Sequence, residues 1–127
     1  MNYNEIENKI DQINTEDKIW IIYIGIIFLS WYANELEKNY FKNNNNYCKE
    51  KYRQVMIFIF SILVIIYFYF LKSSLNDIKN LKPSDSTRKK NLTYLSFIGS
   101  SLIAISGLIF LYIALKDEDI NVEIAFN

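Results

Sequence analysis

The chain has 127 residues, with 14 basic and 14 acidic side chains and no net charge. This balance argues against the strongly basic surface by which proteins bind nucleic acid. The absence of histidine excludes a histidine-based catalytic triad, metal site or pH switch, and the single cysteine excludes an internal disulfide.

Residues 1–18 carry apolar side chains at spacings of three and four, which is typical of one face of an amphipathic helix. These positions are Tyr3, Ile6, Ile10 and Ile13. Thr15 can cap a following helix, and Glu16 and Asp17 suit the positive end of its dipole. We therefore predict an amphipathic helix over 1–18 and a break near Asn14. This helix either packs against lipid headgroups and neighbouring loops or docks a partner helix.

Three runs without a charged residue follow, at 19–33, 55–71 and 92–115. A helix needs about 20 apolar residues to cross the hydrocarbon core, with a range of about 17–25. The third run meets this length, the second meets its lower limit, and Leu36 can extend the first. None of the runs shows the polar face of a soluble helix. We predict an all-α integral membrane protein with three transmembrane helices in a small bundle. Its membrane domain covers 19–116, with spans over about 19–36, 55–71 and 92–115.

Four consecutive asparagines at 43–46 favour a turn over a helix. Helical patterns lie on both sides of this segment. We therefore predict a helical hairpin, with the first helix continuing to about Lys42 and the second beginning near Tyr47. Cys48 lies at the tip of the hairpin, where it is either an incidental free thiol or, beside Lys49, a reactive one.

The second helix is expected to run beyond the membrane, because apolar residues continue at helical spacing to Leu81 and Pro83 then ends the pattern. The following loop is basic and suits an anionic leaflet. Its role is either to determine the topology or to bind a specific lipid. The candidate headgroup contacts are Lys72, Lys79, Lys82, Arg88, Lys89 and Lys90.

The third run carries a stripe of small residues, which allows helices to approach closely and lets hydroxyls bond across the contact. The stripe consists of Ser96, Gly99, Ser100, Ala104 and Gly107. It either packs within the subunit against the second span, or forms a subunit interface or the lining of a pore.

The tail at 117–127 begins acidic and then alternates apolar and polar residues, which is the period of a strand. A lone strand is not stable in water, so we expect it to pair with another subunit, pair with a partner protein or stay disordered. The apolar positions are Ile120, Val122, Ile124 and Phe126.

The positive-inside rule counts Lys and Arg residues on the two sides of the membrane. Three crossings place eight of them on the side of the N-terminal tail and six on the opposite side. We predict a cytoplasmic N-terminal tail and an outside C-terminal tail. The richness in Ile, Asn, Lys and Tyr indicates an AT-rich bacterial or viral genome, and we expect a bacterial inner membrane.

None of the three runs contains an ionisable residue, which argues against ion-coupled transport and against hydrolysis within the membrane. We expect no enzyme activity, no metal and no cofactor. In architecture alone, the chain resembles phage holins and small membrane effectors of bacterial toxin and phage-defence systems. We hypothesise an oligomerising effector that permeabilises a membrane or acts like a channel. The alternative is an accessory or immunity subunit of a larger membrane complex. The expected partners are the bilayer and either a second copy or another membrane protein, and not nucleic acid.

Overall fold

The computed structural model describes residues 2–124 and consists of three long helices with short connections. Helix α1 spans Tyr3–Asn43, α2 spans Asn46–Lys79 and α3 spans Thr87–Lys116. Each helix is long and apolar enough to cross a membrane. Residues 2–124 contain no strand. The prediction of an all-α, multi-pass membrane protein is confirmed.

Helix α1 is a single helix of 41 residues, so the predicted break near Asn14 is wrong. Thr15 does not cap a second helix, because its hydroxyl donates to the carbonyl oxygen of Asp11 at 3.1 Å, one turn earlier. The cap lies at the start of the chain, where Asn2 and Glu5 form a reciprocal capping box. No glycine or proline lies between residues 3 and 24, and extending a helix costs less than nucleating a new one.

The predicted hairpin turn between α1 and α2 is confirmed and contains two residues. Asn44 adopts a left-handed conformation at φ 52° and ψ 40°, which asparagine tolerates better than most residues. The side chain of Asn45 caps α2 by accepting hydrogen bonds from the N–H groups of Tyr47 at 3.0 Å and Cys48 at 3.3 Å. The two helix ends lie within one residue of the predicted positions.

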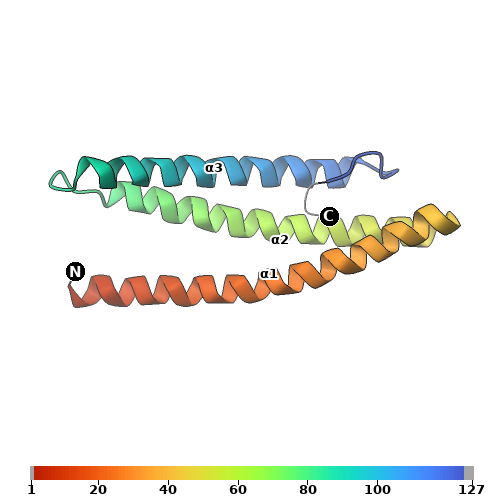
Figure 1. Cartoon of the computed structure of the whole chain (residues 1–127), viewed down its shortest axis with the longest axis horizontal. Coiled ribbons are helices and arrows are strands. Elements are labelled where there is room, and N and C mark those ends of the chain that lie inside the picture. Colours follow the sequence, from red (N-terminus) through yellow and green to blue (C-terminus); the bar gives the residue numbers. More distant parts are fainter. Residues whose placement is uncertain (1, 125–127) are drawn as a thin grey trace.

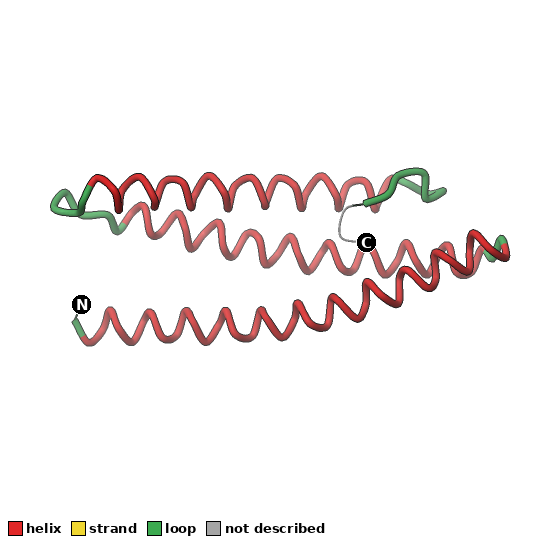
Figure 2. Tube along the Cα trace, viewed as in Figure 1, coloured by secondary structure: helices red, strands yellow, loops and turns green. Residues whose placement is uncertain are grey.

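Helix α2 is the central element of the bundle and packs against both α1 and α3, while α1 and α3 make no such contact with each other over the described residues. Helices α1 and α2 meet near the hairpin turn and diverge toward the N-terminus (Figures 1 and 2). The hairpin turn and the described tail lie at what we call the closed end. The N-terminus and the α2–α3 loop lie at the opposite, open end (Figure 1).

The buried core is centred on α2 and concentrated toward the closed end. Ala33 of α1 is completely buried, and its small side chain allows the two backbones to approach. The rings of Phe60 and Phe110 join α2 to α3 with centroids 5.7 Å apart. Cys48 is buried, so it lacks the exposure that a reactive thiol requires. The buried cluster comprises Ala33, Leu36, Cys48, Tyr52, Met56, Ile59, Phe60, Leu63, Ala114 and Ile124.

The described part of the tail, residues 117–124, is a loop that folds back on the closed end. The carboxylate of Asp117 accepts hydrogen bonds from two backbone N–H groups, four and five residues later, at 3.0 and 2.8 Å. Lys49 forms a 3.0 Å ion pair with Asp119, and the guanidinium of Arg53 donates to the carbonyl oxygen of Asp117 at 3.2 Å. These contacts attach the tail to the start of α2.

The predicted strand conformation is therefore wrong for these residues. Ile120 has a positive φ of 55°, which interrupts any extended pattern. Ile124 is buried in the core, while Val122 remains half exposed. The free energy gained by burying Ile124 and by forming the turn at Asp117 outweighs the preference of the alternating sequence for an extended strand. Phe126 lies outside the described residues, and pairing of the tail with another chain stays a prediction.

Candidate functional site

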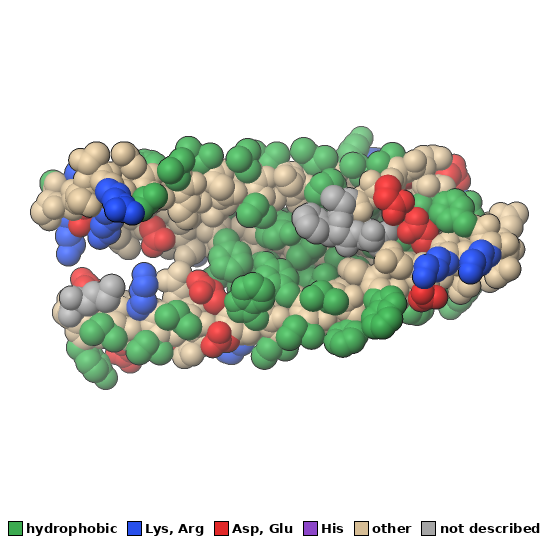
Figure 3. Space-filling view, viewed as in Figure 1, with side chains coloured by type: hydrophobic (Ala, Val, Ile, Leu, Met, Phe, Trp, Pro, Cys, Tyr) green, Lys and Arg blue, Asp and Glu red, His purple; other side chains and the backbone are tan. Residues whose placement is uncertain are grey.

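A cleft separates the N-terminal half of α1 from α2 and α3 at the open end, and it is visible as a hollow in the surface (Figure 3). It has two parts. The outer part, which we call the mouth, is a cavity of about 570 Å³ whose wall includes Lys9, Asp77, Arg88, Lys89, Thr93 and Ser96. The inner part, which we call the groove, is a cavity of about 380 Å³ whose wall includes Glu16, Trp20, Tyr23, Tyr67, Ser100 and Ile103.

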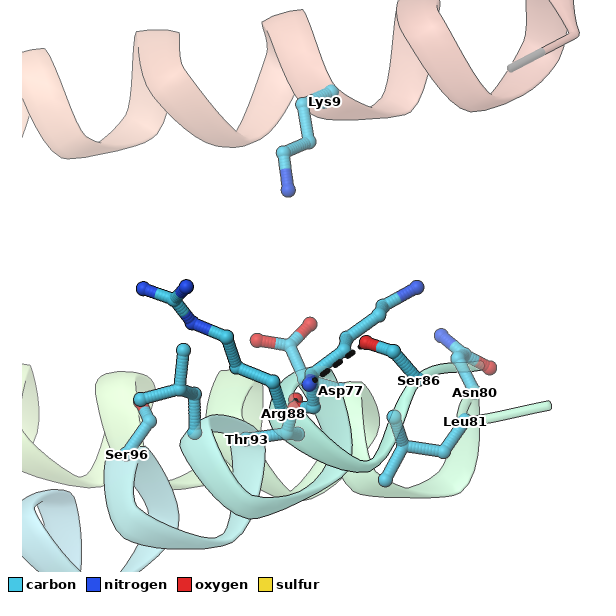
Figure 4. A pocket seen from close by; sticks show the side chains of 10 residues that line it. Lys9, Asp77, Asn80, Leu81, Ser86, Arg88, Thr93 and Ser96 are labelled. Atoms are coloured by element: carbon cyan, nitrogen blue, oxygen red, sulfur yellow. Dashed lines mark hydrogen bonds between the residues drawn. The ribbon is translucent and has the colours of Figure 1, made fainter. Parts of the chain in front are cut away.

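The mouth contains more positive than negative charge. Lys9 and Arg88 extend into it from α1 and α3, and Asp77 of α2 is the carboxylate in its wall (Figure 4). Lys89 also lines it but forms a 3.2 Å ion pair with Asp85. Within residues 2–124, neither Lys9 nor Arg88 forms an ion pair. Two cations from different helices are therefore available to an anion.

The loop that carries the basic residues is fixed by Asp85. The carboxylate of Asp85 accepts a hydrogen bond from the backbone N–H of Lys82 at 2.7 Å and one from the ammonium of Lys89 at 3.2 Å. The first of these bonds, followed by the lysine charges, holds the pKa of Asp85 below its usual value. Ser86 caps α3 by accepting from the N–H of Lys89 at 3.1 Å. The α2–α3 turn thus presents Arg88 from a defined backbone.

The groove lies deeper along the helices and is mostly apolar. Trp20 and Tyr23 of α1 pack edge to face with ring centroids 5.5 Å apart, and Tyr67 of α2 and Ile103 of α3 complete the walls. The mouth extends along α3 to Ser96 and the groove begins at Ser100. These positions are one turn apart, or about 6 Å. The two cavities therefore succeed each other along one cleft.

A hydrogen bond joins the two sides of the cleft. The side-chain amide of Gln12 on α1 donates to the hydroxyl of Ser73 on α2 at 3.1 Å. The same amide also donates to the carboxylate of Glu16 at 3.4 Å. Glu16 stands at the wall of the groove and Gln12 in cavities beside the mouth. The hydrogen-bonded pair of Gln12 and Ser73 marks the level at which the lining of the cleft changes from polar to mostly apolar.

The predicted small-residue stripe divides into two groups. Ala104 and Gly107 are buried, and a Cβ atom on Gly107 would lie 2.7 Å from Cδ2 of Tyr67. Glycine at this position therefore permits close packing of α3 on α2 within one subunit.

The other three stripe residues lie toward the open end. Ser96 is exposed in the mouth and Ser100 faces the groove. A Cβ atom on Gly99 would meet no atom within 4 Å. These positions are not used in tight packing between the described helices, so they remain accessible to another molecule.

The predicted headgroup residues are distributed over three neighbouring cavities. Arg88 and Lys89 line the mouth, Lys82 lines a cavity next to it, and Lys72 lines another beside Gln12. Lys79 and Lys90 line none of these. The ammonium of Lys90 instead donates to the carbonyl oxygen of Pro83 at 3.3 Å.

Lys9 and Asp77 are mouth residues that the sequence interpretation did not assign to a site. Lys9 lies 79 positions before Arg88, so no local spacing relates the two. The sequence contains a partial signal, because a helix that continues through residue 14 places Lys9 beside the basic loop between α2 and α3. The prediction of a break removed that signal.

The described residues contain no cluster of three or more histidine, cysteine or carboxylate side chains able to hold a metal ion. Comparisons of the chain with known protein families, curated proteins and solved structures give no match.

Proposed function

We propose that this protein is a small effector that oligomerises in a bacterial inner membrane and makes it permeable. The proposal keeps the N-terminus and the α2–α3 loop in the cytoplasm and the tail outside. The structure is compatible with this arrangement, since the N-terminus and the α2–α3 loop lie at one end and the described tail at the other (Figure 1).

The observation that carries the proposal is the hydroxyl-bearing edge of α3. Ser96 and Ser100 face the cleft, although the rest of the span is dominated by isoleucine and leucine. Only 17% of the most apolar window of α3 is buried inside the chain, so most of the circumference of this helix is available to lipid or to a second copy. In an oligomer, this edge provides the polar surface that water in a membrane pore requires.

A leakage assay tests this function. The purified chain is reconstituted into vesicles that contain a self-quenching dye, and its mass is measured in nanodiscs. We expect dye release that rises more steeply than linearly with protein concentration, together with an oligomeric mass. A monomer that releases no dye would overturn the proposal, and co-purification of a stoichiometric membrane partner would favour the accessory-subunit alternative.

Paired serine variants refine the assay. Ser96→Ala with Ser100→Ala removes the hydroxyls that face the cleft, and we expect slower dye release. Ser101→Ala is the matched control, because the hydroxyl of Ser101 already donates to the carbonyl oxygen of Phe97 at 2.8 Å. Equal release by both variants would exclude the cleft edge as the conducting surface.

The orientation is tested by labelling. In a Cys48→Ser background, single cysteines replace Lys79 near the open end and Glu50 near the closed end. We expect a membrane-impermeant maleimide added to intact cells to label the cysteine at position 50 and not the one at position 79. The reverse pattern would invert the proposed topology.

A further inference from the structure

We propose that the cleft binds one phospholipid molecule, with the headgroup phosphate in the mouth between Lys9 and Arg88 and one acyl chain in the groove between α1 and α3. This inference concerns a ligand site in the single chain and is tested without dye release. Because Ser96 and Ser100 also form the proposed conducting edge, the lipid must leave the cleft before an oligomer conducts. It goes beyond a general attraction of the basic loop to lipid, because it assigns a defined site to particular residues from two helices.

The first argument is charge complementarity. Lys9 and Arg88 reach the mouth from opposite sides of the cleft and form no ion pair within residues 2–124 (Figure 4). A guanidinium binds phosphate oxygens in a bidentate manner, and an ammonium acts as a point charge. Lys89 is paired with Asp85, so Lys9 and Arg88 against the single carboxylate of Asp77 leave the mouth positive. Ser96 supplies a hydroxyl donor on the inner side, whereas the hydroxyl of Thr93 already donates to the carbonyl oxygen of Lys89 at 2.7 Å.

The second argument is depth. Arg88 precedes the third apolar run, which begins at Leu92, by four residues, or about 6 Å along the helix. The polar layer on each side of the hydrocarbon is about 5–7 Å thick, so Arg88 lies at the headgroup level. Lys9 lies on α1 across the cleft from Arg88, and its side chain extends into the cleft (Figure 4). Long basic side chains reach the headgroup layer in this way.

The third argument is the order of the two cavities. The groove continues from the mouth within one helical turn. Its polar wall residues are Glu16 and Ser100, and the rest of the wall is aromatic and aliphatic. An apolar space at this depth in a bilayer is filled by hydrocarbon rather than by water. A polar cavity followed by an apolar one matches the order of headgroup and acyl chain in a phospholipid.

Retention of lipid in detergent tests the site, because a micelle removes the general surface attraction of a charged membrane. The full chain is reconstituted with phosphatidylglycerol, extracted into a neutral detergent and weighed by native mass spectrometry. We expect one phosphatidylglycerol per chain. We expect Lys9→Gln with Arg88→Gln to weaken the binding of this lipid about thirtyfold, on the basis of about 1 kcal/mol for each of the two basic contacts.

The matched control is Lys79→Gln with Lys90→Gln, which removes the same charge from residues that line neither cavity. We expect less than a twofold change in occupancy. Equal losses in both double variants would overturn the proposal, because they would indicate diffuse attraction rather than a site.

A second pair of variants tests the acyl chain without a change of charge. Ser100→Phe places a ring in the groove, whereas Ser106→Phe places it on an exposed face of α3. We expect only Ser100→Phe to reduce retention. Equal retention in these two variants would overturn the placement of the acyl chain.

Competition distinguishes a lipid from a free anion. Millimolar inorganic phosphate or glycerol phosphate is added before extraction, and we expect neither to displace the lipid. Complete displacement by inorganic phosphate would show that the mouth binds a free anion and would overturn the lipid assignment.

Discussion

The closed and open ends are built from the same three helices but differ in how closely the helices approach. At the closed end, Ala33 and Ala114 are buried among larger side chains, and the tail returns to place Ile124 in the core. At the open end, bulky rings such as Trp20 and Tyr67 stand where α1 faces the rest of the bundle. Small residues let backbones approach and large rings separate them. Small buried residues therefore accompany the packed end of the bundle, and large rings line the walls of the open end.

Loss of the largest fully buried side chain is expected to disturb the closed end most. Phe60 is 2% exposed. Phe60→Ala leaves a void on the order of 100 Å³, and a cavity cost of about 24 cal/mol per Å³ predicts a loss of about 2 kcal/mol in the free energy of unfolding. The transfer term adds little, because detergent tails are as apolar as the core.

Unfolding in a denaturing detergent provides the measurement. Phe58→Ala is the control on the same helix, because this side chain is 55% exposed. We expect Phe58→Ala to lower the free energy of unfolding by less than half as much as Phe60→Ala. Similar shifts would mean that the packing around Phe60 contributes no more than general apolar area.

A smaller effect is expected for Gly107→Ala, at the close contact between α2 and α3. The added Cβ would lie 2.7 Å from Cδ2 and 3.1 Å from Cε2 of Tyr67, so the ring must move. We expect a loss of about 1 kcal/mol, at the low end for overpacking.

Gly99→Ala is the control for helix propensity, which improves equally in both variants. A Cβ at Gly99 meets open space, so this variant should unfold at the same or a higher denaturant concentration. A destabilised Gly99→Ala would contradict the division of the stripe into packed and open parts.

Removal of the hydrogen bond between Gln12 and Ser73 at the open end is expected to have a weaker effect. Gln12→Ala breaks the hydrogen bond to Ser73, and bonds of this kind between membrane helices average about 0.6 kcal/mol. A double-mutant cycle with Ser73→Ala measures the coupling in the free energy of unfolding. A coupling near zero would show that α1 is held to α2 by the closed end alone.

The smallest expected effect is on the docking of the tail as a function of pH. Burial raises the pKa of Asp117, but the N–H donors of Asn121 and Val122 outweigh it and leave that pKa below 3.8. The contribution of Asp117 is therefore present above pH 3.8 and is lost as the pH falls through the lowered value. The hydrogen bond to Asp119 raises the pKa of Lys49 above 10.5, so this contribution is present below pH 10.5 and is lost as the pH rises through the raised value.

Hydrogen exchange of the tail amides measures this window. We expect protection between about pH 4 and 10, with loss at both extremes. Asp117→Asn should remove the loss of protection at low pH, and Asp119→Asn should remove the loss at high pH. A tail equally protected at all pH values would show that the burial of Ile124 alone holds it.

Local patterns in the sequence were sufficient for much of the fold. The three uncharged runs, the turn at 43–46 and the end of the second helix before Pro83 all appear in the structure. The break near Asn14 was wrong, because a residue suited to capping also remains helical when its hydroxyl bonds back one turn. The tail was wrong, because Ile124 gains more from the core than an isolated strand provides.

The cleft could not be predicted in the same way. Its walls come from three segments far apart in the chain, and its width depends on the side chains that separate α1 from α2 and α3. The basic residues of the α2–α3 turn were identified from their composition. Their approach to Lys9 follows only from the length and direction of α1.

The unequal uncharged runs have a consequence for the surrounding bilayer. The span of α1, extended by Leu36, covers 18 residues or about 27 Å, whereas the run of 24 residues in α3 covers about 36 Å, against a hydrocarbon thickness of about 30 Å. Because α2 lies between these helices, the short and long segments face different lipids. Beside α1 the membrane thins or flanking side chains extend to its surface, while α3 tilts or thickens the membrane beside it. The protein thus imposes a thickness gradient across its own width, and its distribution among membranes should depend on the length of their acyl chains.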